Sequence, residues 1–206
     1  MIRPVAKAVG AVVLALLIGV AVAAGLAWKL HRALAPDPET VAAASLRAVR
    51  EQAVLTPFAA RFVAVVTSEQ RRFGLSARET LIMPGMVRYE IDLAALRQRD
   101  LRWDAATRTL TVTLPPLRVS PPAVDLARTQ AYGGGGVLMA LTNAATELDA
   151  ANRRAGEAEL VHQARDPLPM RLAADAARRA IERSFALPLR AAGIDATVTA
   201  RFAGER

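Results

Sequence analysis

Glu90 and Asp92 have the residue type and spacing of a possible acid–base pair. They lie two positions apart in the segment 86–93, where apolar and polar residues alternate strictly. Successive side chains of a strand point to opposite faces, so this alternation predicts a strand with both carboxylates on its solvent-facing side. Paired carboxylates can perform acid–base catalysis or bind a cation. Arg88 shares their face, however, and an ion pair across neighbouring strands is the simpler interpretation. Arg88, Glu90 and Asp92 are therefore candidates for a functional surface, without an assigned catalytic role.

Other residues offer little support for catalysis or for a bound cofactor. His31 and His162 do not occur in the H-E-x-x-H spacing that places two imidazoles on one metal ion. The four glycines 133–136 are not followed by the lysine of a phosphate-binding loop, so a flexible hinge is the preferred interpretation. The chain has no cysteine, which excludes thiolate nucleophiles, cysteine zinc sites and disulfides. The sequence predicts no catalytic, cofactor-binding or metal-binding residue and no cofactor; it favours a non-enzymatic protein and leaves an enzyme open.

The positive net charge is a weak indication of nucleic-acid binding. The chain has a formal net charge of +8, but four of its cations flank an apolar segment near the N-terminus, and the residues from Ala33 on carry +4. Aromatic side chains, which stack on bases, make up only 4% of the residues. Nucleic-acid-binding proteins usually combine clustered cations with such aromatics. We therefore expect no nucleic-acid partner.

An uncharged segment over residues 8–28 predicts a transmembrane helix. It has 21 residues, without proline or a strongly polar side chain. At 1.5 Å per residue a helix of this length spans about 31 Å, which matches a hydrocarbon core of about 30 Å. Trp28 ends the segment, where an indole suits the membrane interface. The flanking cations are Arg3, Lys7, Lys29 and Arg32. The predicted partner of residues 8–28 is the lipid bilayer.

The direction of this anchor is less constrained than its existence. Cations on the two sides are nearly equal in number, so the positive-inside rule gives no strong preference. A short basic region followed by an apolar one is typical of a signal-anchor, which favours a domain in the periplasm, at the outer face of the bacterial inner membrane. Alternatively, cleavage after Ala23 would release a soluble periplasmic protein. The expected order is an N-terminal tail (1–7), a signal-anchor helix (8–28), a linker (29–36) and one domain (37–206).

Three helices are predicted in this domain. Asp37 followed by Pro38 is typical of a helix N-terminus, and this helix continues to about Gln52. A second helix is expected from about residue 141 to 165, with an apolar face of Leu141, Ala145, Leu148, Ala151 and Ala155. A third begins after Asp166 and ends near Pro188 and Gly193. Its apolar stripe consists of Leu172, Ala176, Ala180 and Ser184 with Ala173, Ala177, Ile181 and Phe185.

Strands are predicted where apolar and polar residues alternate or where β-branched residues gather. The expected segments are 54–67, 86–93, 101–103, 110–114 and 194–202, and a hairpin loop that begins at Asp104 joins the third to the fourth. Pro84 and Gly85 are expected to form a turn or bulge, and residues 120–136 to cross the surface with one helical turn. Since strands cluster instead of alternating with helices, the predicted fold class is α+β. We expect a mostly antiparallel sheet of about five strands, packed on one face by two or three helices.

Three short segments of the domain carry a resemblance to a known family. They are Val54-Leu55-Thr56, the segment from Gly85 to Leu93, and Leu114-Pro115-Pro116. Together with the helix over 167–192 and the final strand, they are similar to the bacterial family called domain of unknown function 4230. The resemblance implies one N-terminal membrane helix followed by a single domain. It implies no established activity and therefore transfers no catalytic residue.

These observations favour a non-enzymatic binding or interaction module at the outer face of the inner membrane, with an envelope protein or a lipid as its partner. The predicted anchor and the lack of a catalytic motif motivate this hypothesis. A hydrolase or transferase that uses Glu90 and Asp92 is one alternative. The cleaved, soluble periplasmic protein is another.

Overall fold

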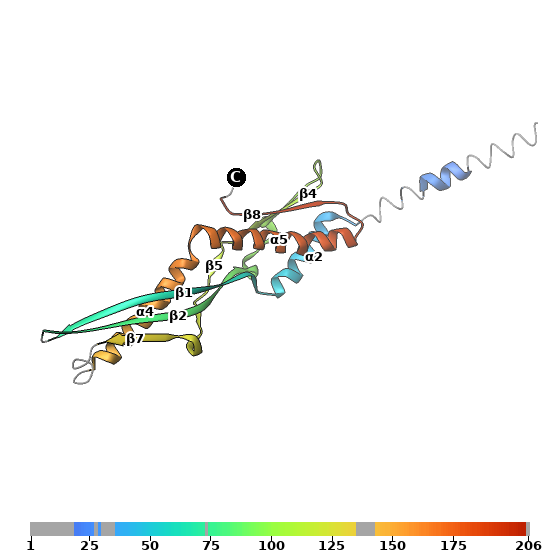
Figure 1. Ribbon diagram of the computed structural model, residues 1–206. Coiled ribbons are helices and arrows are strands. Elements are labelled where there is room, and N and C mark those ends of the chain that lie inside the picture. Colours follow the sequence, from blue (N-terminus) through green and yellow to red (C-terminus); the bar gives the residue numbers. More distant parts are fainter. Residues whose placement is uncertain (1–18, 27–28, 30–35, 73, 135–142, 205–206) are drawn as a thin grey trace, which may run out of the picture.

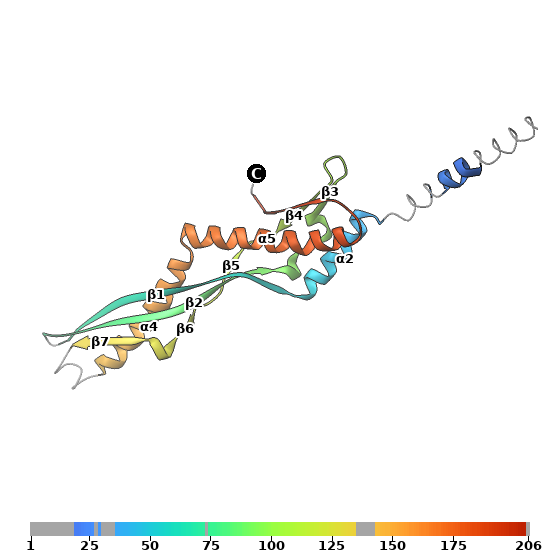
Figure 2. The same ribbon diagram turned by 45° about the vertical axis from the view of Figure 1, so that its right-hand side comes forward.

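A computed structural model describes residues 19–26, 29, 36–72, 74–134 and 143–204. From residue 36 on, these residues form an elongated α+β domain (Figure 1). At one end, α2 (Pro38–Glu51), α5 (Pro167–Ala191) and a small sheet enclose the largest cluster of buried side chains. A long β-hairpin runs from there to the other end, with α4 (Ala144–Ala164) along it (Figure 2). The predicted fold class, α+β with a mostly antiparallel sheet, is confirmed.

The larger sheet is built around the hairpin of β1 (Val54–Arg72) and β2 (Leu75–Asp92). The two antiparallel strands pair in one constant register from Phe58 to Arg72 of β1, and Gly74, with φ +76°, occupies the tight turn between them. The other edge of β2 pairs in turn with three short strands: β5 (Arg118–Val119), β6 (Ala123–Val124) and β7 (Gln130–Gly134). β2 is therefore central in this sheet, and β1 is an edge strand.

The smaller sheet has the order β3-β4-β8. β3 (Leu101–Asp104) and β4 (Thr109–Leu114) form the predicted hairpin, and the Asp104 carboxylate accepts a hydrogen bond from the Ala106 N–H in its loop (2.8 Å). β8 (Thr197–Phe202) lies on the other side of β4 and runs parallel to it. A C-terminal strand forms as predicted, but it begins at Thr197 instead of Ile194. The expectation of one sheet is corrected, because the predicted strands 101–103, 110–114 and 194–202 lie in this separate three-stranded sheet.

The helix starts and the face of the third helix follow the sequence pattern. At the start of α2, the Asp37 carboxylate accepts hydrogen bonds from the Thr40 N–H (3.0 Å) and hydroxyl (2.8 Å), which lower the pKa of Asp37. α5 begins at Pro167 and continues through Pro188, which was expected near its end. Its buried residues, Ala173, Ala177, Ile181, Phe185 and Leu189, include one row of the predicted stripe. The other predicted row is less buried, and Leu172 is 46% exposed.

The buried face of α4 differs from the predicted alanine stripe. Its buried residues recur at every fourth position: Ala144, Leu148, Asn152, Gly156, Leu160 and Ala164. Only Leu148 was predicted; Ala145 and Ala155 are exposed, Ala151 is half-buried, and Leu141 lies outside the described residues. Because a polar residue and a glycine lie in the centre of this face, the pattern of hydrophobic residues does not predict it.

Asn152 and Gly156 face inwards because of what they pack against. The Asn152 side-chain N–H₂ group donates to the backbone carbonyl of Glu79 in β2 (3.1 Å), so its amide nitrogen has a partner inside the interface. A Cβ atom at Gly156 would lie 3.0 Å from the sulfur of Met83. The glycine therefore lets the helix approach β2 closely without displacing the Met83 side chain.

The prediction of a turn or bulge at Pro84 and Gly85 was wrong, because both residues lie within β2. The Pro84 carbonyl accepts a hydrogen bond from the Asp125 N–H (2.9 Å), so the backbone of this residue points away from β1. The missing N–H of proline therefore removes no bond from the β1–β2 ladder. A Cβ atom at Gly85 would lie 2.7 Å from Leu160 Cδ1, so close packing against α4 explains the glycine.

Two further predictions are corrected by the larger sheet. β1 continues to Arg72, beyond the predicted end at Thr67. Residues 120–136 contain β6, a short 3₁₀ helix (Leu126–Arg128) and β7. Gly133 and Gly134 pair with Glu79 and Arg78 of β2 and so belong to a strand instead of a hinge; glycines 135 and 136 lie outside the described residues.

Only part of the predicted anchor is described. Residues 19–26 and Lys29 are helical and exposed, whereas 8–18 and 27–28 lie outside the described residues, as do Arg3, Lys7, His31 and Arg32. Within the described part of the chain, no helix combines the length and the hydropathy that a membrane crossing needs. The anchor stays a prediction from the sequence.

Candidate binding surface

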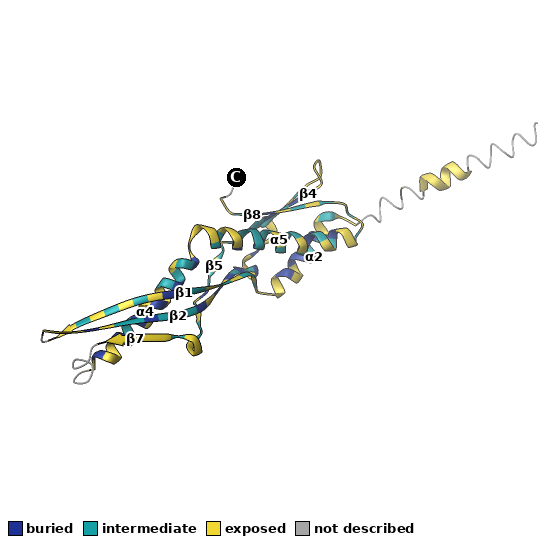
Figure 3. Ribbon diagram, viewed as in Figure 1, coloured by how far each residue is buried: buried dark blue, intermediate teal, exposed yellow. Residues whose placement is uncertain are grey.

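The side of the β1–β2 hairpin that faces away from α4 carries an exposed apolar patch. The inward side contains buried residues such as Ala64 and Leu81. On the outward side, Val63 and Val65 of β1 lie opposite Pro84 and Ile82 of β2. We call five residues the apolar face: Val63, Val65, Ile82, Pro84 and Met86. The exposed fractions are 48% for Val63, 61% for Val65 and 40% for Met86. Figure 3 shows the alternation of exposure along β1 that produces this face.

Polar pairs border the apolar face towards the hairpin tip. The Thr67 and Thr80 hydroxyl groups, opposite each other on the two strands, are hydrogen-bonded (2.8 Å). Next to them, the Glu69 carboxylate accepts hydrogen bonds from Arg71 (2.7 Å) and Arg78 (3.2 Å). These two guanidinium groups hold the pKa of Glu69 below its usual value. This border therefore has two guanidinium groups that share one carboxylate.

The three residues predicted as a functional surface form the opposite border. Arg88 Nε lies 3.3 Å from a Glu90 carboxylate oxygen, and an Arg118 nitrogen of β5 lies 3.8 Å from an Asp92 oxygen. Glu90 and Arg118 are also register partners across β2 and β5. The structure thus brings Arg88, Glu90 and Asp92 together with Arg118 as surface ion pairs. The pair of Arg118 with Asp92 crosses neighbouring strands, as the sequence predicts, whereas Arg88 and Glu90 pair within one strand. Such exposed pairs contribute little to stability, in the range of about 0–1 kcal/mol.

The described residues do not bring a catalytic constellation to Glu90 and Asp92. The described strands contain no histidine. His162, the one histidine among the described residues, is exposed on α4. Within the described chain, no group of three or more His, Asp or Glu side chains is placed to hold a metal ion. The shared face of the two carboxylates motivated the hypothesis of a hydrolase or transferase. Their ion pairs with arginines account for this arrangement without a catalytic role.

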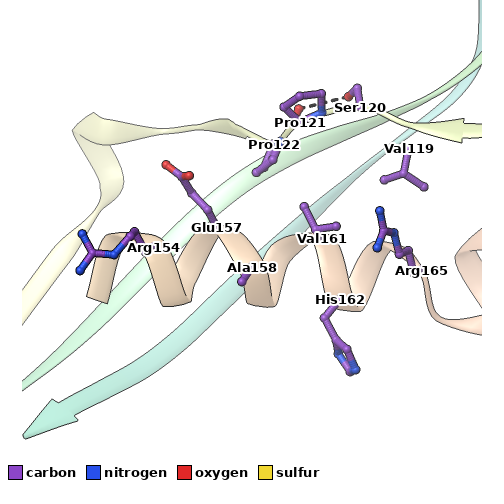
Figure 4. A pocket seen from close by; sticks show the side chains of 10 residues that line it. All are labelled: Val119, Ser120, Pro121, Pro122, Arg154, Glu157, Ala158, Val161, His162 and Arg165. Atoms are coloured by element: carbon purple, nitrogen blue, oxygen red, sulfur yellow. Dashed lines mark hydrogen bonds between the residues drawn. The ribbon is translucent and has the colours of Figure 1, made fainter. Parts of the chain in front are cut away.

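A cavity of about 680 Å³ lies elsewhere, between α4 and the connection from β5 to β6 (Figure 4). Its polar groups do not converge on one point. Arg154 and Arg165 lie at opposite ends of the lining, and the His162 ring points away from it. The Ser120 hydroxyl accepts a hydrogen bond from the Arg88 backbone N–H (3.1 Å). The cavity therefore lacks the convergent polar groups that are typical of an active site.

The apolar face rests on a fixed support. Next to it, on the inward side of β2 between Arg88 and Glu90, the fully buried Tyr89 donates a hydrogen bond from its hydroxyl to the Ala164 carbonyl at the end of α4 (2.7 Å). Burial, together with the negative charge of Asp166, raises the pKa of Tyr89. Its ring packs against Phe58 of β1, with centroids 5.4 Å apart. The hairpin and the two long helices are thus joined at one point beneath the exposed side.

Sequence analysis missed the apolar face, although a signal for it is present. The segment 62–66, Phe-Val-Ala-Val-Val, is apolar on both sides of a strand. The expected sheet has helices on one face only, so one of these two sides had to remain uncovered. Combining the two expectations would have pointed to Val63 and Val65.

The comparisons with known proteins agree with the architecture. A family described as protein of unknown function (DUF4230) matches residues 47–200, from α2 into β8. No curated protein and no solved structure shows significant similarity to the chain. The family match spans most of the α+β domain and includes both the long hairpin and the helices that support it. The chain therefore belongs to the DUF4230 family.

Proposed function

We propose that the protein is a non-enzymatic binding module, anchored at the outer face of the bacterial inner membrane by residues 8–28, which binds an envelope protein through its apolar face. The anchoring is supported by the uncharged 21-residue segment and its flanking cations. The single observation that supports the binding role is the exposure of Val63, Val65 and Met86 on one side of a well-packed hairpin.

An exposed apolar patch of this kind needs an explanation. In monomeric soluble proteins, contiguous apolar patches usually mark interaction sites. Exposed apolar side chains on this side do not contribute to the packing of the hairpin, because its other side makes the buried contacts with α4. Apolar side chains at five neighbouring positions, rimmed by charged pairs, match the usual anatomy of a protein–protein interface.

A protein partner suits this face better than a lipid. The face is formed by short side chains on a pleated sheet, which favour packing against another flat protein surface. The bordering arginines Arg78 and Arg88 already have carboxylate partners, so they offer little free charge for anionic lipid headgroups. The exposed Arg61, which lies opposite Met86, adds a single cation to this side of the hairpin. Binding of lipid alone would therefore contradict the proposal.

Two measurements test the two parts of the proposal. For the anchor, membranes that contain the full chain are washed with alkaline carbonate; the chain is expected to stay in the pellet. For the face, the full chain is cross-linked in membranes and recovered. Met86→Asp is expected to abolish the capture of a specific protein, because it places a charge within an apolar contact.

Leu187→Asp is the matched control, since Leu187 is 64% exposed on α5 and lies outside the apolar face. This variant should retain the captured protein. Equal capture by wild type and both variants would show that binding does not use the face. An anchored chain that captures no specific protein would reject the binding role while leaving the anchor intact.

A further inference from the structure

The free edge of β1 is a second unassigned feature of the hairpin. Within the described residues, β1 pairs with β2 alone. Its register with β2 is irregular between Leu55 and Phe58 but constant from Phe58 to Arg72, and this stretch contains no proline. An unpaired edge presents a row of N–H and C=O groups that can add another strand. Proteins usually shorten, bend or cover such an edge, and this one is long and regular.

Hydrogen bonds show which residues of β1 turn their backbone groups towards this edge. The Pro84 carbonyl points to the far side of β2, where it accepts from the Asp125 N–H. In an antiparallel pair, the residue opposite must then point away as well, and Val63 lies opposite Pro84. The Val63 carbonyl accordingly accepts a hydrogen bond from the Gln163 side chain (3.3 Å) instead of from β2. Because the direction alternates, the odd-numbered residues from 59 to 71 face the free edge.

The side chains at these positions are complementary to those of a second copy of β1 that runs antiparallel to the first. From residue 61 to 69, the odd positions read Arg61, Val63, Val65, Thr67 and Glu69. When a second β1 is placed antiparallel about Val65, Val65 meets its own copy, Val63 meets Thr67, and Arg61 meets Glu69. A two-fold axis makes each of the last two pairs occur twice. The register therefore places a basic and an acidic side chain opposite each other at both ends of an apolar centre.

Neighbouring registers lose this complementarity. Shifting the centre of the pair by one residue places Arg61 opposite either Thr67 or Arg71. The first arrangement has no charge pair, and the second brings two guanidinium groups together. Opposite charges across a sheet stabilise pairing, and like charges destabilise it. Charge thus selects the register centred on Val65.

We propose that two copies of the protein pair through β1, antiparallel and centred on Val65, and form a symmetric dimer with one continuous sheet. In this pairing, backbone hydrogen bonds between the two strands replace the exposed hydrogen bond from the Gln163 side chain to the Val63 carbonyl. Since the two-fold axis is perpendicular to the sheet, both apolar faces lie on the same side of the dimer. The inference goes beyond the proposed function and requires neither the anchor nor the envelope partner.

Single cysteine variants of the full chain test the register directly. The natural chain has no cysteine, so one introduced thiol reports on one position. In the proposed dimer, the Cα atoms of the two residues 65 lie about 5.5 Å apart, within the range that a disulfide spans. The two residues 63 are offset by four positions, about 13 Å along the strands, which is too far.

Val65→Cys is therefore expected to form a disulfide-linked dimer under mild oxidation in membranes or detergent, and a reductant should dissolve it. Val63→Cys, an exposed valine of the same strand, is the matched control and should stay monomeric. Failure of Val65→Cys to form the dimer would overturn the proposal, as would equal amounts of dimer in the two variants.

A charge variant in the Val65→Cys background tests the Arg61–Glu69 pair. Arg61→Glu places two carboxylates opposite each other at both ends of the centre, so the fraction of dimer is expected to fall about threefold or more at low salt. Arg102→Glu, an exposed position of β3, is the control and should leave the fraction unchanged. An undiminished fraction in Arg61→Glu would contradict the proposed register. These readouts do not depend on whether carbonate removes the chain from membranes, so they remain distinct from the test of the anchor.

Discussion

Removal of a single hydroxyl group, in Tyr89→Phe, tests how the helices are joined to the long hairpin. The Tyr89 hydroxyl donates to the Ala164 carbonyl (2.7 Å), and both residues are fully buried. Phenylalanine retains the ring and its contact with Phe58, so the loss is confined to the hydrogen bond. A buried carbonyl left without a partner costs about 1–3 kcal/mol. We expect a decrease of this size in the free energy of unfolding.

Urea unfolding of the full chain in a mild detergent, followed by circular dichroism, measures this decrease, and its pH dependence gives a second signature. The pKa of Tyr89 is raised above its usual value of about 10, chiefly by burial. The folded state therefore holds the phenolic proton more tightly than the unfolded state. The resulting stability is fully present below pH of about 10 and is lost as the pH rises towards the folded pKa. Phenylalanine has no such proton, so the difference between the two proteins should shrink in the alkaline range.

Two results would refute this reasoning. A decrease below about 0.5 kcal/mol at neutral pH, the size typical of neutral surface changes, would show that the Ala164 carbonyl finds another donor. A decrease that stays constant through the alkaline range would show that Tyr89 does not titrate differently in the two states.

Three further substitutions examine the core, the helix–strand contact and a helix cap by the same unfolding measurement. Phe185→Ala empties a fully buried site and should cost about 3–5 kcal/mol, whereas Leu187→Ala at a 64% exposed site of the same helix should change stability by less than about 0.5 kcal/mol. Gly85→Ala should cost about 1–3 kcal/mol through overpacking against Leu160. If this clash occurs, Leu160→Ala should destabilise the Gly85→Ala variant less than it destabilises the wild type. Asp37→Ala should destabilise α2 at neutral pH; because the pKa of Asp37 is lowered in the folded state, the effect should fade as the pH falls below its unfolded value of about 3.9.

The position of the apolar face also bears on how the protein avoids aggregation. An exposed strand with Val63 and Val65 at its edge is a liability if left unpaired, because any compatible strand can add to it. Pairing with one defined copy satisfies the edge, and the charges at Arg61 and Glu69 restrict which register is allowed. Both proposals therefore assign a partner to a surface that the described residues leave uncovered.

Elements that depend on neighbours in the chain were predictable from the sequence. The start of α2 at Pro38 follows from the Asp37 cap, because an aspartate there satisfies N–H groups that the helix itself leaves free. The hairpin of β3 and β4 follows from alternation around an aspartate turn. The buried row of α5 follows from apolar residues repeating every four positions. The ion pairing of Arg88 with Glu90 was predictable because residues two apart share one side of a strand.

Other features were decided by contacts between distant parts of the chain. Pro84 and Gly85 resemble a turn locally, yet they lie in β2, because the proline carbonyl finds Asp125 and the glycine admits Leu160. Asn152 looks like a surface residue of α4 but is buried, because the backbone of Glu79 provides its partner. The sequence by itself therefore determined the local elements, through caps and alternation, whereas the anchor that its hydropathy predicts stays a prediction. Only the tertiary structure decided how far the hairpin extends, which of its sides α4 covers and which edge remains free, because each of these depends on a packing partner that lies far away in the chain.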